Sequence, residues 1–192
     1  MQSYLEIPTT ATTVALITAR RDSQRLAFKN RQTVGGIALW HRSYLFARAC
    51  GLRPVVDTDD EVIIEACRHR GYEVHKRTVA SEAEGGTHWQ AIRATADDLG
   101  LTHFALLQPT SPFRSRQVML DALAAFDEHK TTVLTYSTPE VWDGNLGIYL
   151  HPETVGHPVW VRNPFACSLQ IDTPEDLAEA IQAARWMPSI AL

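Results

Sequence analysis

At 192 residues, with 45% hydrophobic and 21% charged residues, the chain has the composition of one globular domain with a full-sized core. A formal net charge of −4 argues against broad binding to nucleic acid or to anionic membranes, because duplex binders usually carry a basic face. We therefore expect no nucleic-acid partner and no membrane partner, and we favour a small anion as the ligand.

The cysteines and the apolar runs point to the compartment. Cys50, Cys67 and Cys167 lie far apart and lack C-x-x-C spacing, so neither a disulfide framework nor a zinc site is indicated. No apolar run approaches the roughly 20 residues that span a bilayer, and residues 1–12 lack the pattern of a signal peptide. We expect a cytoplasmic protein.

Short apolar runs alternate with longer amphipathic segments, a pattern typical of an α/β fold with a mainly parallel central sheet and helices on both faces. The expected strands span residues 13–17, 54–57, 73–76, 103–108 and 131–136. The expected helices span residues 37–50, 58–71, 84–99 and 116–129, and a last one begins at Thr173. No repeat or low-complexity linker divides the chain, so residues 1–192 are expected to form a single domain.

Helix signals support several of these assignments. Glycines at 51, 71 and 100 are good helix stops, and Thr173, Pro174 and Asp176 have the form of an N-cap, a first helical residue and a capping box. The residues expected on buried helix faces are Leu39, Ser43, Phe46, Ala47, Val62, Ile63, Ala66, Cys67, Trp89 and Trp186.

Periodicity fails over residues 137–167, where prolines and glycines divide the segment into short strands and turns. A lid, an acceptor pocket and an edge hairpin are all compatible with this pattern. Trp142 and Trp160 fall within it, and a packed edge is favoured for them over a substrate platform.

A cationic loop follows the first strand. Between positions 19 and 31, five cations face the single carboxylate of Asp22, a net charge of +4 within an acidic protein; the cations are Arg20, Arg21, Arg25, Lys29 and Arg31. The loop leaves a strand at its carboxyl end, where open α/β sheets bind ligands. It lacks both G-x-x-x-x-G-K-[ST] and G-x-G-x-x-G, so phosphates would have to be held by side chains, including the Ser23 hydroxyl. A solvated basic turn is the alternative.

Polar residues follow other strands as well. Asp57, Asp59 and Asp60 could gather a metal, but helix capping explains two of these carboxylates and is favoured. The amide of Gln108 could recognise a base, a hydroxyl or a carboxylate. Asp172 could bind a Mg²⁺ ion that phosphates carry, since such an ion needs only one or two carboxylates. The eight histidines show no H-E-x-x-H pairing, so the sequence singles out no catalytic histidine.

In order, these motifs resemble the cytidylyltransferase family of the acylneuraminate type, which activates acidic sugars. The family's loop A-R-x-G-S-x-R-x-x-x-K-N is matched by Ala19, Arg20, Ser23, Arg25, Lys29 and Asn30. Later segments resemble its L-G-G turn at 34–36, S-T-D-D at 58–60, L-L-Q-P-T-S-P at 106–112, N-G-A-x-Y-I at 145–150 and I-D-T-P-E-D-L at 171–177. The matches run from about residue 14 to residue 184.

The resemblance implies a Rossmann-like nucleotidyltransferase fold and attack by an acceptor hydroxyl on the α-phosphorus of CTP, with release of pyrophosphate. It implies that Arg20, Lys29 and Asp172 are catalytic and that Gln108 faces the acceptor, a nonulosonic acid such as sialic, pseudaminic or legionaminic acid. It also implies a nucleotide site formed by Ala19, Arg20, Ser23, Arg25, Lys29 and Asn30, with Asn30 helping to recognise cytosine. Asp172 would bind Mg²⁺ or Mn²⁺.

Three departures from the family pattern modify these expectations. Asp22 replaces a loop glycine, which predicts weaker nucleotide binding through its charge and its Cβ. Gln170 replaces an aspartate, which leaves one metal-ligand position neutral. Only residues 137–144 remain where the family places an arm that completes the partner subunit's sugar site, so a homodimer stays open without that arm. A different small acceptor, a different base, and a catalytically silent nucleotide-binding or regulatory homologue are the competing functions.

Overall fold

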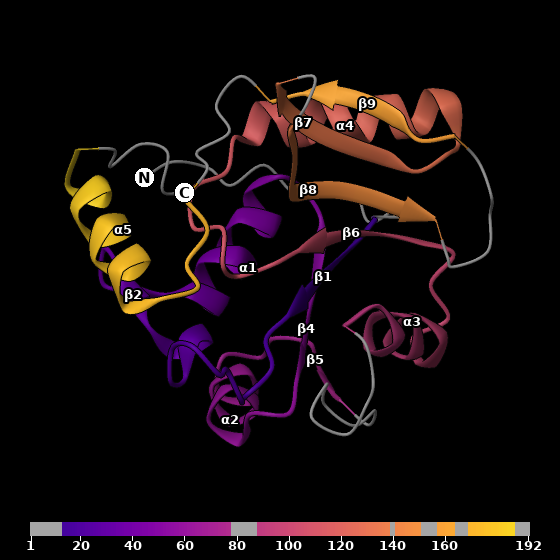
Figure 1. Cartoon of the computed structure of the whole chain (residues 1–192). Helices are drawn as coiled ribbons and strands as arrows, with labels where there is room; N and C mark the ends of the chain where they lie inside the picture. Colours follow the sequence, from indigo (N-terminus) through magenta and orange to yellow (C-terminus); the bar gives the residue numbers. More distant parts are fainter. Residues whose placement is uncertain (1–12, 78–87, 139–140, 151–156, 164–168, 187–192) are drawn as a thin grey trace, which may run out of the picture.

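A computed structural model describes residues 13–77, 88–138, 141–150, 157–163 and 169–186. These residues form a seven-stranded sheet, five α-helices and a small two-stranded hairpin (Figure 1). In the spatial order β5, β4, β1, β6, β8, β7 and β9, the strands are Val74–Lys76, Arg53–Thr58, Val14–Thr18, His103–Leu107, Val141–Leu150, Val133–Thr138 and Val159–Arg162. From α1 to α5, the helices are Leu39–Ala49, Glu61–His69, His88–Asp98, Arg116–His129 and Pro174–Trp186.

The parallel part of the sheet is its buried centre. β1 lies between β4 and β6 and is parallel to both, with Leu16 opposite Val55 on one side and Leu106 on the other. Every residue of β1 is buried, as expected for a parallel strand that is covered on both faces. Beyond β6 the sheet is mixed, because β8 is antiparallel to β6 and to β7 whereas β9 is parallel to β7.

Helices cover both faces of this sheet. Ala15 and Ile17 of β1 point into a core that includes residues of α1, α2 and α4. Leu16, on the opposite face, packs with Ile92 and Ala96 of α3. The expected α/β fold with a mainly parallel sheet and helices on both faces is therefore confirmed. Among the described helices, none is both long enough and apolar enough to cross a bilayer.

The last helix packs outside the sheet and fixes the segment before it. Leu26, Val34, Leu39 and Phe113 form a separate cluster with Ile171 and with Ala180 of α5. The backbone N–H of Ile171 donates to the carbonyl of Thr110 at 2.8 Å. Thr173 and Asp176 cap each other reciprocally, since each backbone N–H donates to the other's side-chain oxygen. The predicted capping box is confirmed, and it holds the residue that precedes it, Asp172, in one place.

The first helix begins two residues later than predicted. Ile37 and Ala38 pair with β2 (Thr33–Val34) as a short strand, β3 (Ile37–Ala38), before α1 starts at Leu39. Gly35 and Gly36 form the turn between them with φ values of 60° and 77°. Positive φ at both central turn positions favours glycine, which explains why a hairpin forms here rather than an earlier helix turn.

The segment expected to be irregular contains two strands, β8 and β9, and the last two residues of β7. Instead of short pieces, residues 141–150 form one ten-residue strand, β8, which pairs with both β6 and β7. Its pairing with β7 begins next to the connection, where Thr138 lies opposite Val141. β9 is at the edge of the sheet, and Trp160 on it is about half exposed and meets Tyr136 edge-on. Part of the 137–167 region, including Cys167, lies outside the described residues.

Three residues expected on buried helix faces are exposed. Val62 lies in the first turn of α2, where its side chain is 56% exposed. Trp89 is about half exposed near the start of α3, and Trp186 is 85% exposed as the last residue of α5. All three lie within two residues of a helix end, where a helix extends past the neighbours that bury its middle.

Candidate active site

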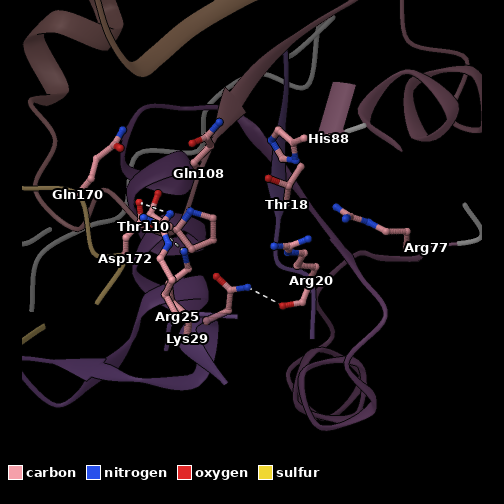
Figure 2. Close-up of a pocket in the computed structure, with 12 residues that line it drawn as sticks. Thr18, Arg20, Arg25, Lys29, Arg77, His88, Gln108, Thr110, Gln170 and Asp172 are labelled. Atoms are coloured by element: carbon pink, nitrogen blue, oxygen red, sulfur yellow. Dashed lines mark hydrogen bonds and ion pairs between the residues drawn. The ribbon is translucent and has the colours of Figure 1, made fainter. Parts of the chain in front are cut away.

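A cavity of about 310 Å³ lies at the carboxyl end of the parallel strands (Figure 2). Thr18 ends β1, while Gln108 and Arg77 directly follow β6 and β5. The lining residues are Thr18, Arg20, Arg25, Lys29, Asn30, Arg77, His88, Gln108, Pro109, Thr110, Gln170 and Asp172. The volume is at the lower end of the range of small-molecule sites, about 300–1,000 Å³.

The cationic loop is fixed to the sheet at its start. The Ala19 N–H donates to the Asp57 carbonyl at 2.8 Å, and the Thr58 hydroxyl donates to the Ala19 carbonyl. Asn30 is buried, and its amide donates to the Arg20 carbonyl at 2.8 Å, which closes the loop upon itself. A backbone carbonyl and a hydroxyl of β4, together with one internal amide, therefore hold the loop beside the cavity.

Two cations of the loop share one carboxylate from the other end of the chain. Lys29 Nζ lies 2.7 Å from Asp172 Oδ1, and Arg25 Nη2 lies 2.9 Å from Asp172 Oδ2. The Lys29 side chain is only 15% exposed, whereas that of Arg25 is 66% exposed. We call Arg25, Lys29 and Asp172 the Asp172 cluster; it joins residues more than 140 positions apart, and it leaves one net positive charge in the cavity.

Two buried arginines support the loop that carries Gln108. Arg114 donates to the Gln108 carbonyl and to the Ser43 hydroxyl, and Arg42 donates to the carbonyls of Val34 and Pro112. Burial lowers the pKa of Arg114 to about 9, and the nearby Arg42 charge acts in the same direction. The wall around Gln108 is therefore held from α1 and from the segment that follows its own strand.

Arg77 and His88 are cavity residues that the sequence did not single out. Figure 2 shows both away from Asp172 and Gln170, on the side of Thr18. Arg77 follows a short strand, so the rule that ligands bind at strand ends could have identified it. His88 is the first residue of α3, and the expected start of that helix, residues 84–87, lies outside the described residues.

The cavity gathers most of the predicted site residues. Arg20, Arg25, Lys29, Asn30, Gln108, Gln170 and Asp172 all line it. Ala19 is fully buried behind the loop, and Ser23 is half-buried; neither is among the lining residues.

Asp22 lies outside the cavity, contrary to the argument that placed its charge beside bound phosphates. Its side chain is 81% exposed, and its carboxylate is 3.9 Å from the Arg21 guanidinium. Asp22 is also absent from the described residues with positive φ, so its backbone does not need glycine. The Asp22 charge is therefore exposed beside Arg21 and its backbone does not need glycine, while its effect on nucleotide binding stays a prediction.

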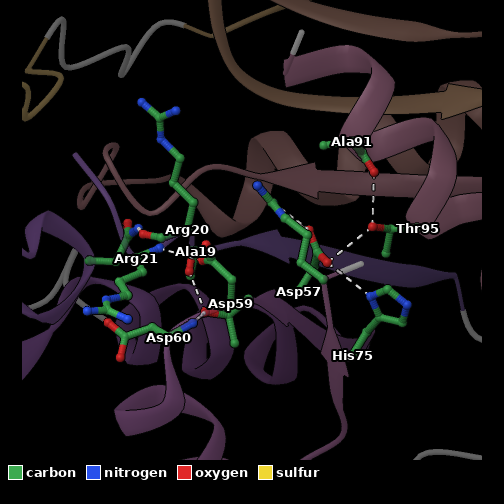
Figure 3. Close-up of polar contacts among 12 residues, drawn as sticks. Ala19, Arg20, Arg21, Asp57, Asp59, Asp60, His75, Ala91 and Thr95 are labelled. Carbon is green, nitrogen blue, oxygen red and sulfur yellow. Dashed lines mark hydrogen bonds and ion pairs between the residues drawn. The ribbon is translucent and has the colours of Figure 1, made fainter. Parts of the chain in front are cut away.

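The carboxylates after β4 have structural partners. Asp60 caps α2 by accepting from the Val62 N–H, and it also pairs with Arg31. Asp59 accepts from the Arg21 N–H (Figure 3). Within the described residues, no group of three or more His, Cys, Asp or Glu side chains is arranged to hold a metal. The capping interpretation is confirmed for Asp60.

An open, mostly parallel sheet with a cation-rich cavity at its strand ends is the architecture of a nucleotide-binding α/β protein. The family model described as "Cytidylyltransferase" matches residues 14–147, which include the cationic loop and Gln108. The chain belongs to the cytidylyltransferase family and is thus a nucleotidyltransferase. Gln170 and Asp172 lie beyond the matched segment.

Solved structures share this fold at low sequence identity. A CMP:2-keto-3-deoxy-manno-octonic acid synthetase complexed with CTP superposes with a TM-score of 0.71 at 13% identity, covering 92% of this chain and 99% of its own. The 4-diphosphocytidyl-2C-methyl-D-erythritol synthase of Anaerococcus prevotii gives 0.69 at 13% identity, covering 91% and 98%. A cytidylyltransferase of Leptospira borgpetersenii gives 0.65 at 15% identity, covering 94% and 97%. At such identities the likeness establishes the fold alone.

Proposed function

We propose that this cytidylyltransferase transfers CMP from CTP to an acidic sugar of the nonulosonic type and releases pyrophosphate. The observation that carries the proposal is the set of three cations, Arg20, Arg25 and Lys29, that line one cavity with Asp172. A triphosphate is the ligand that such a set fits, because each cation can neutralise a phosphate oxygen. The ordered motifs from the cationic loop to the segment before α5 add support for the acylneuraminate type.

We assign roles to the loop residues as part of this proposal. Arg20 and Arg25 can each fork onto non-bridging oxygens, and the half-buried Lys29 supplies a point charge. We assign the α-phosphate to Lys29, because its ammonium is the more buried of the two paired cations. In-line attack by the acceptor hydroxyl then places negative charge where these cations already lie. Catalysis in this scheme rests on positioning and charge neutralisation.

Asp172 is the proposed ligand for Mg²⁺ or Mn²⁺. A single carboxylate fits a magnesium ion that arrives with phosphate oxygens and waters, and it does not fit an ion held by protein side chains alone. When bound, the ion would neutralise phosphate charge and orient the α-phosphate. In the free protein, Arg25 and Lys29 occupy both oxygens of this carboxylate. A triphosphate that takes over the two cations therefore frees Asp172, so nucleotide and metal should bind cooperatively.

Gln108 is the proposed contact for the acceptor. Its side chain lines the cavity, and its backbone is held by the buried Arg114. A neutral amide can donate to a carboxylate and accept from a hydroxyl, both of which an acidic sugar carries. The short connection between β7 and β8 is consistent with a protein that lacks the family's arm, so the acceptor would be bound within one subunit.

The test is pyrophosphate release by the purified protein with each nucleoside triphosphate, Mg²⁺ and a panel of acidic sugars. Release that needs both CTP and a nonulosonic acid supports the proposal. Release with CTP and only another acceptor would assign a different acceptor to the same chemistry. Binding of CTP without turnover on any acceptor would contradict the proposed transfer and favour a silent nucleotide-binding homologue.

A further inference from the structure

Asp57 is a fully buried carboxylate that no part of the proposed chemistry uses. It lies in β4, between β5 and β1, and both of its oxygens have partners (Figure 3). A buried charge is costly unless it is paired and hydrogen-bonded, so these partners matter to the fold. They also connect the core to the cavity.

One oxygen of Asp57 holds Arg77. Arg77 Nε donates to Asp57 Oδ2 at 2.9 Å, and Nη2 donates to the same oxygen. The Arg77 side chain is 5% exposed and lines the cavity. Its backbone N–H also donates to the Thr58 carbonyl at 3.0 Å, which extends the pairing of β5 with β4. Two bonds to one oxygen fix the plane of the guanidinium as well as its position.

The other oxygen of Asp57 is held from two more elements. His75 Nδ1 lies 3.0 Å from Oδ1, and the Thr95 hydroxyl of α3 donates to the same atom at 3.1 Å. His75 Nε2 lies 3.3 Å from the Asp98 carboxylate. We call Asp57, His75, Arg77, Thr95 and Asp98 the Asp57 network. Because β4, β5 and α3 all contribute to it, the carboxylate cannot turn away from Arg77 without breaking contacts on its far side.

We propose that Asp57 is a positioning residue of the nucleotide site: it presents Arg77 to the cavity as a fixed donor for the nucleotide, on the side away from Asp172. The inference rests on the proposed function in that the ligand is taken to be CTP. The hydrogen bond to Asp57 raises the pKa of His75 above its ordinary value. The two ring nitrogens of His75 lie 3.0 Å from Asp57 Oδ1 and 3.3 Å from the Asp98 carboxylate, so His75 holds the Asp57 carboxylate from the side opposite Arg77.

The geometry separates this role from a purely structural one. A lone arginine at a cavity wall can adopt many rotamers, and ordering it on binding costs conformational entropy. An arginine that is already held by Asp57 has lost this freedom before the nucleotide arrives. Asp57 should therefore affect CTP affinity only through Arg77, and it should affect stability through all of its partners.

A double-mutant cycle tests the proposal, with the CTP dissociation constant measured by calorimetry for the full chain. We expect Arg77→Ala and Asp57→Asn each to weaken CTP binding about tenfold, near 1.4 kcal/mol. In the Arg77→Ala background, Asp57→Asn should change the dissociation constant less than about twofold, because there is no guanidinium left to position. Independent, additive effects of the two changes would overturn the proposal, as would an unchanged affinity in Asp57→Asn.

Two further variants test whether a change in CTP affinity arises only from a loss of stability. Asp60→Asn changes another buried carboxylate just beyond the same strand, and we expect its effect on CTP affinity to be the same with and without Arg77. If Asp57→Asn fails to fold, Arg77→Lys replaces it, since lysine keeps the charge but lacks the paired Nε and Nη2 donors. Arg77→Lys should lose about as much affinity as Arg77→Ala, and wild-type affinity would contradict the inference.

The same measurements separate this inference from the proposed function. A wild-type protein that does not bind CTP would overturn both. Normal CTP binding by the wild type, together with no coupling between positions 57 and 77, would overturn the positioning role alone.

Discussion

The two sides of the cavity hold their charges in different ways. The Asp172 cluster pairs a carboxylate with two cations at the surface of the site, and one of these cations, Arg25, is mostly exposed. The Asp57 network instead pairs a fully buried carboxylate of β4 with a histidine of β5, the arginine that follows β5 and a hydroxyl of α3. Exposed pairs contribute little to stability and exchange partners readily, whereas removing one partner of a buried pair is strongly destabilising.

In the proposed function, the contacts of the Asp172 cluster would change when the nucleotide binds, whereas the contacts of the Asp57 network would stay the same. In that proposal, a triphosphate and its metal ion would separate the cations of the Asp172 cluster from the carboxylate, and this is easier for the exposed Arg25 than for Lys29, which is only 15% exposed. A fixed donor such as Arg77 needs a partner that does not exchange. Each of the following measurements either strengthens this contrast or removes it.

The largest effect is expected for Lys29→Ala. Loss of a half-buried ammonium from the triphosphate site should weaken CTP binding about 10- to 100-fold, since a hydrogen bond to a charged group is worth about 1.5–3 kcal/mol. Calorimetry with CTP measures it, and Lys76→Ala, an exposed lysine paired with Glu61 outside the cavity, is the matched control. Equal CTP affinities for the Lys29 variant and the control would show that the triphosphate does not bind at Lys29.

The effect of Asp172→Asn on CTP affinity should have opposite signs without and with Mg²⁺. Without Mg²⁺, removal of the carboxylate frees Lys29 and Arg25 from a competing anion, so CTP should bind a few-fold more tightly. With Mg²⁺, loss of the proposed ligand should weaken CTP binding about tenfold. Titrations with and without the ion measure both arms, and Glu175→Gln, which changes an exposed acid in the same segment, is the control. If the effect on CTP affinity has the same sign in both conditions, the triphosphate does not replace Asp172 as the partner of Lys29 and Arg25.

His75→Asn should remove a pH-dependent part of the stability. The bond to Asp57 raises the pKa of His75 above 6.5, so protonation favours the folded state. This contribution is complete below pH 6.5 and is lost as the pH rises through the raised pKa. Urea unfolding of wild type and variant over this range measures it as a difference. The subtraction is needed because burial lowers the pKa of His41 and His103, whose contributions have the opposite sign. If the difference in unfolding free energy between wild type and variant does not change with pH, the predicted coupling between His75 and Asp57 is wrong.

Asp22→Gly should have the smallest effect. The Asp22 carboxylate is exposed to solvent beside Arg21 and lies outside the cavity, so screening leaves little repulsion of the phosphates. We expect CTP affinity to change less than about twofold in calorimetry at physiological ionic strength. Asp22→Asn, which removes the charge and keeps the Cβ, should behave alike. A tenfold gain with either variant would place Asp22 at the nucleotide after all.

Local patterns were enough to predict much of the fold and part of the site. The first strand, the cationic loop after it and the capping box of α5 each depend on residues close together in sequence, and each appears where expected. The approach of Asp172 to Lys29 depends instead on how α5 packs. Its position before the last helix made Asp172 a candidate for the same site, and the ordered motifs, which resemble a family in which both residues belong to one site, strengthened that expectation.

Other features depend on neighbours that a sequence does not reveal. Asp57 faces His75 because β4 and β5 pair in one particular register, and a change of one residue in that register would separate them. Trp186 was misplaced because helical periodicity does not indicate where the supporting core ends. The hairpin before α1 competes with an extra helical turn, and the outcome depends on backbone freedom at two glycines.

The Asp57 network also constrains how this sequence can change over generations. With Arg77 or His75 removed, the carboxylate at position 57 would be left as a partly uncompensated charge inside the sheet. A lineage that replaces Arg77 should therefore also replace Asp57 with a neutral residue, and chains with a neutral residue at position 57 should tolerate more variety at 75 and 77. We therefore expect these three positions to covary among related sequences.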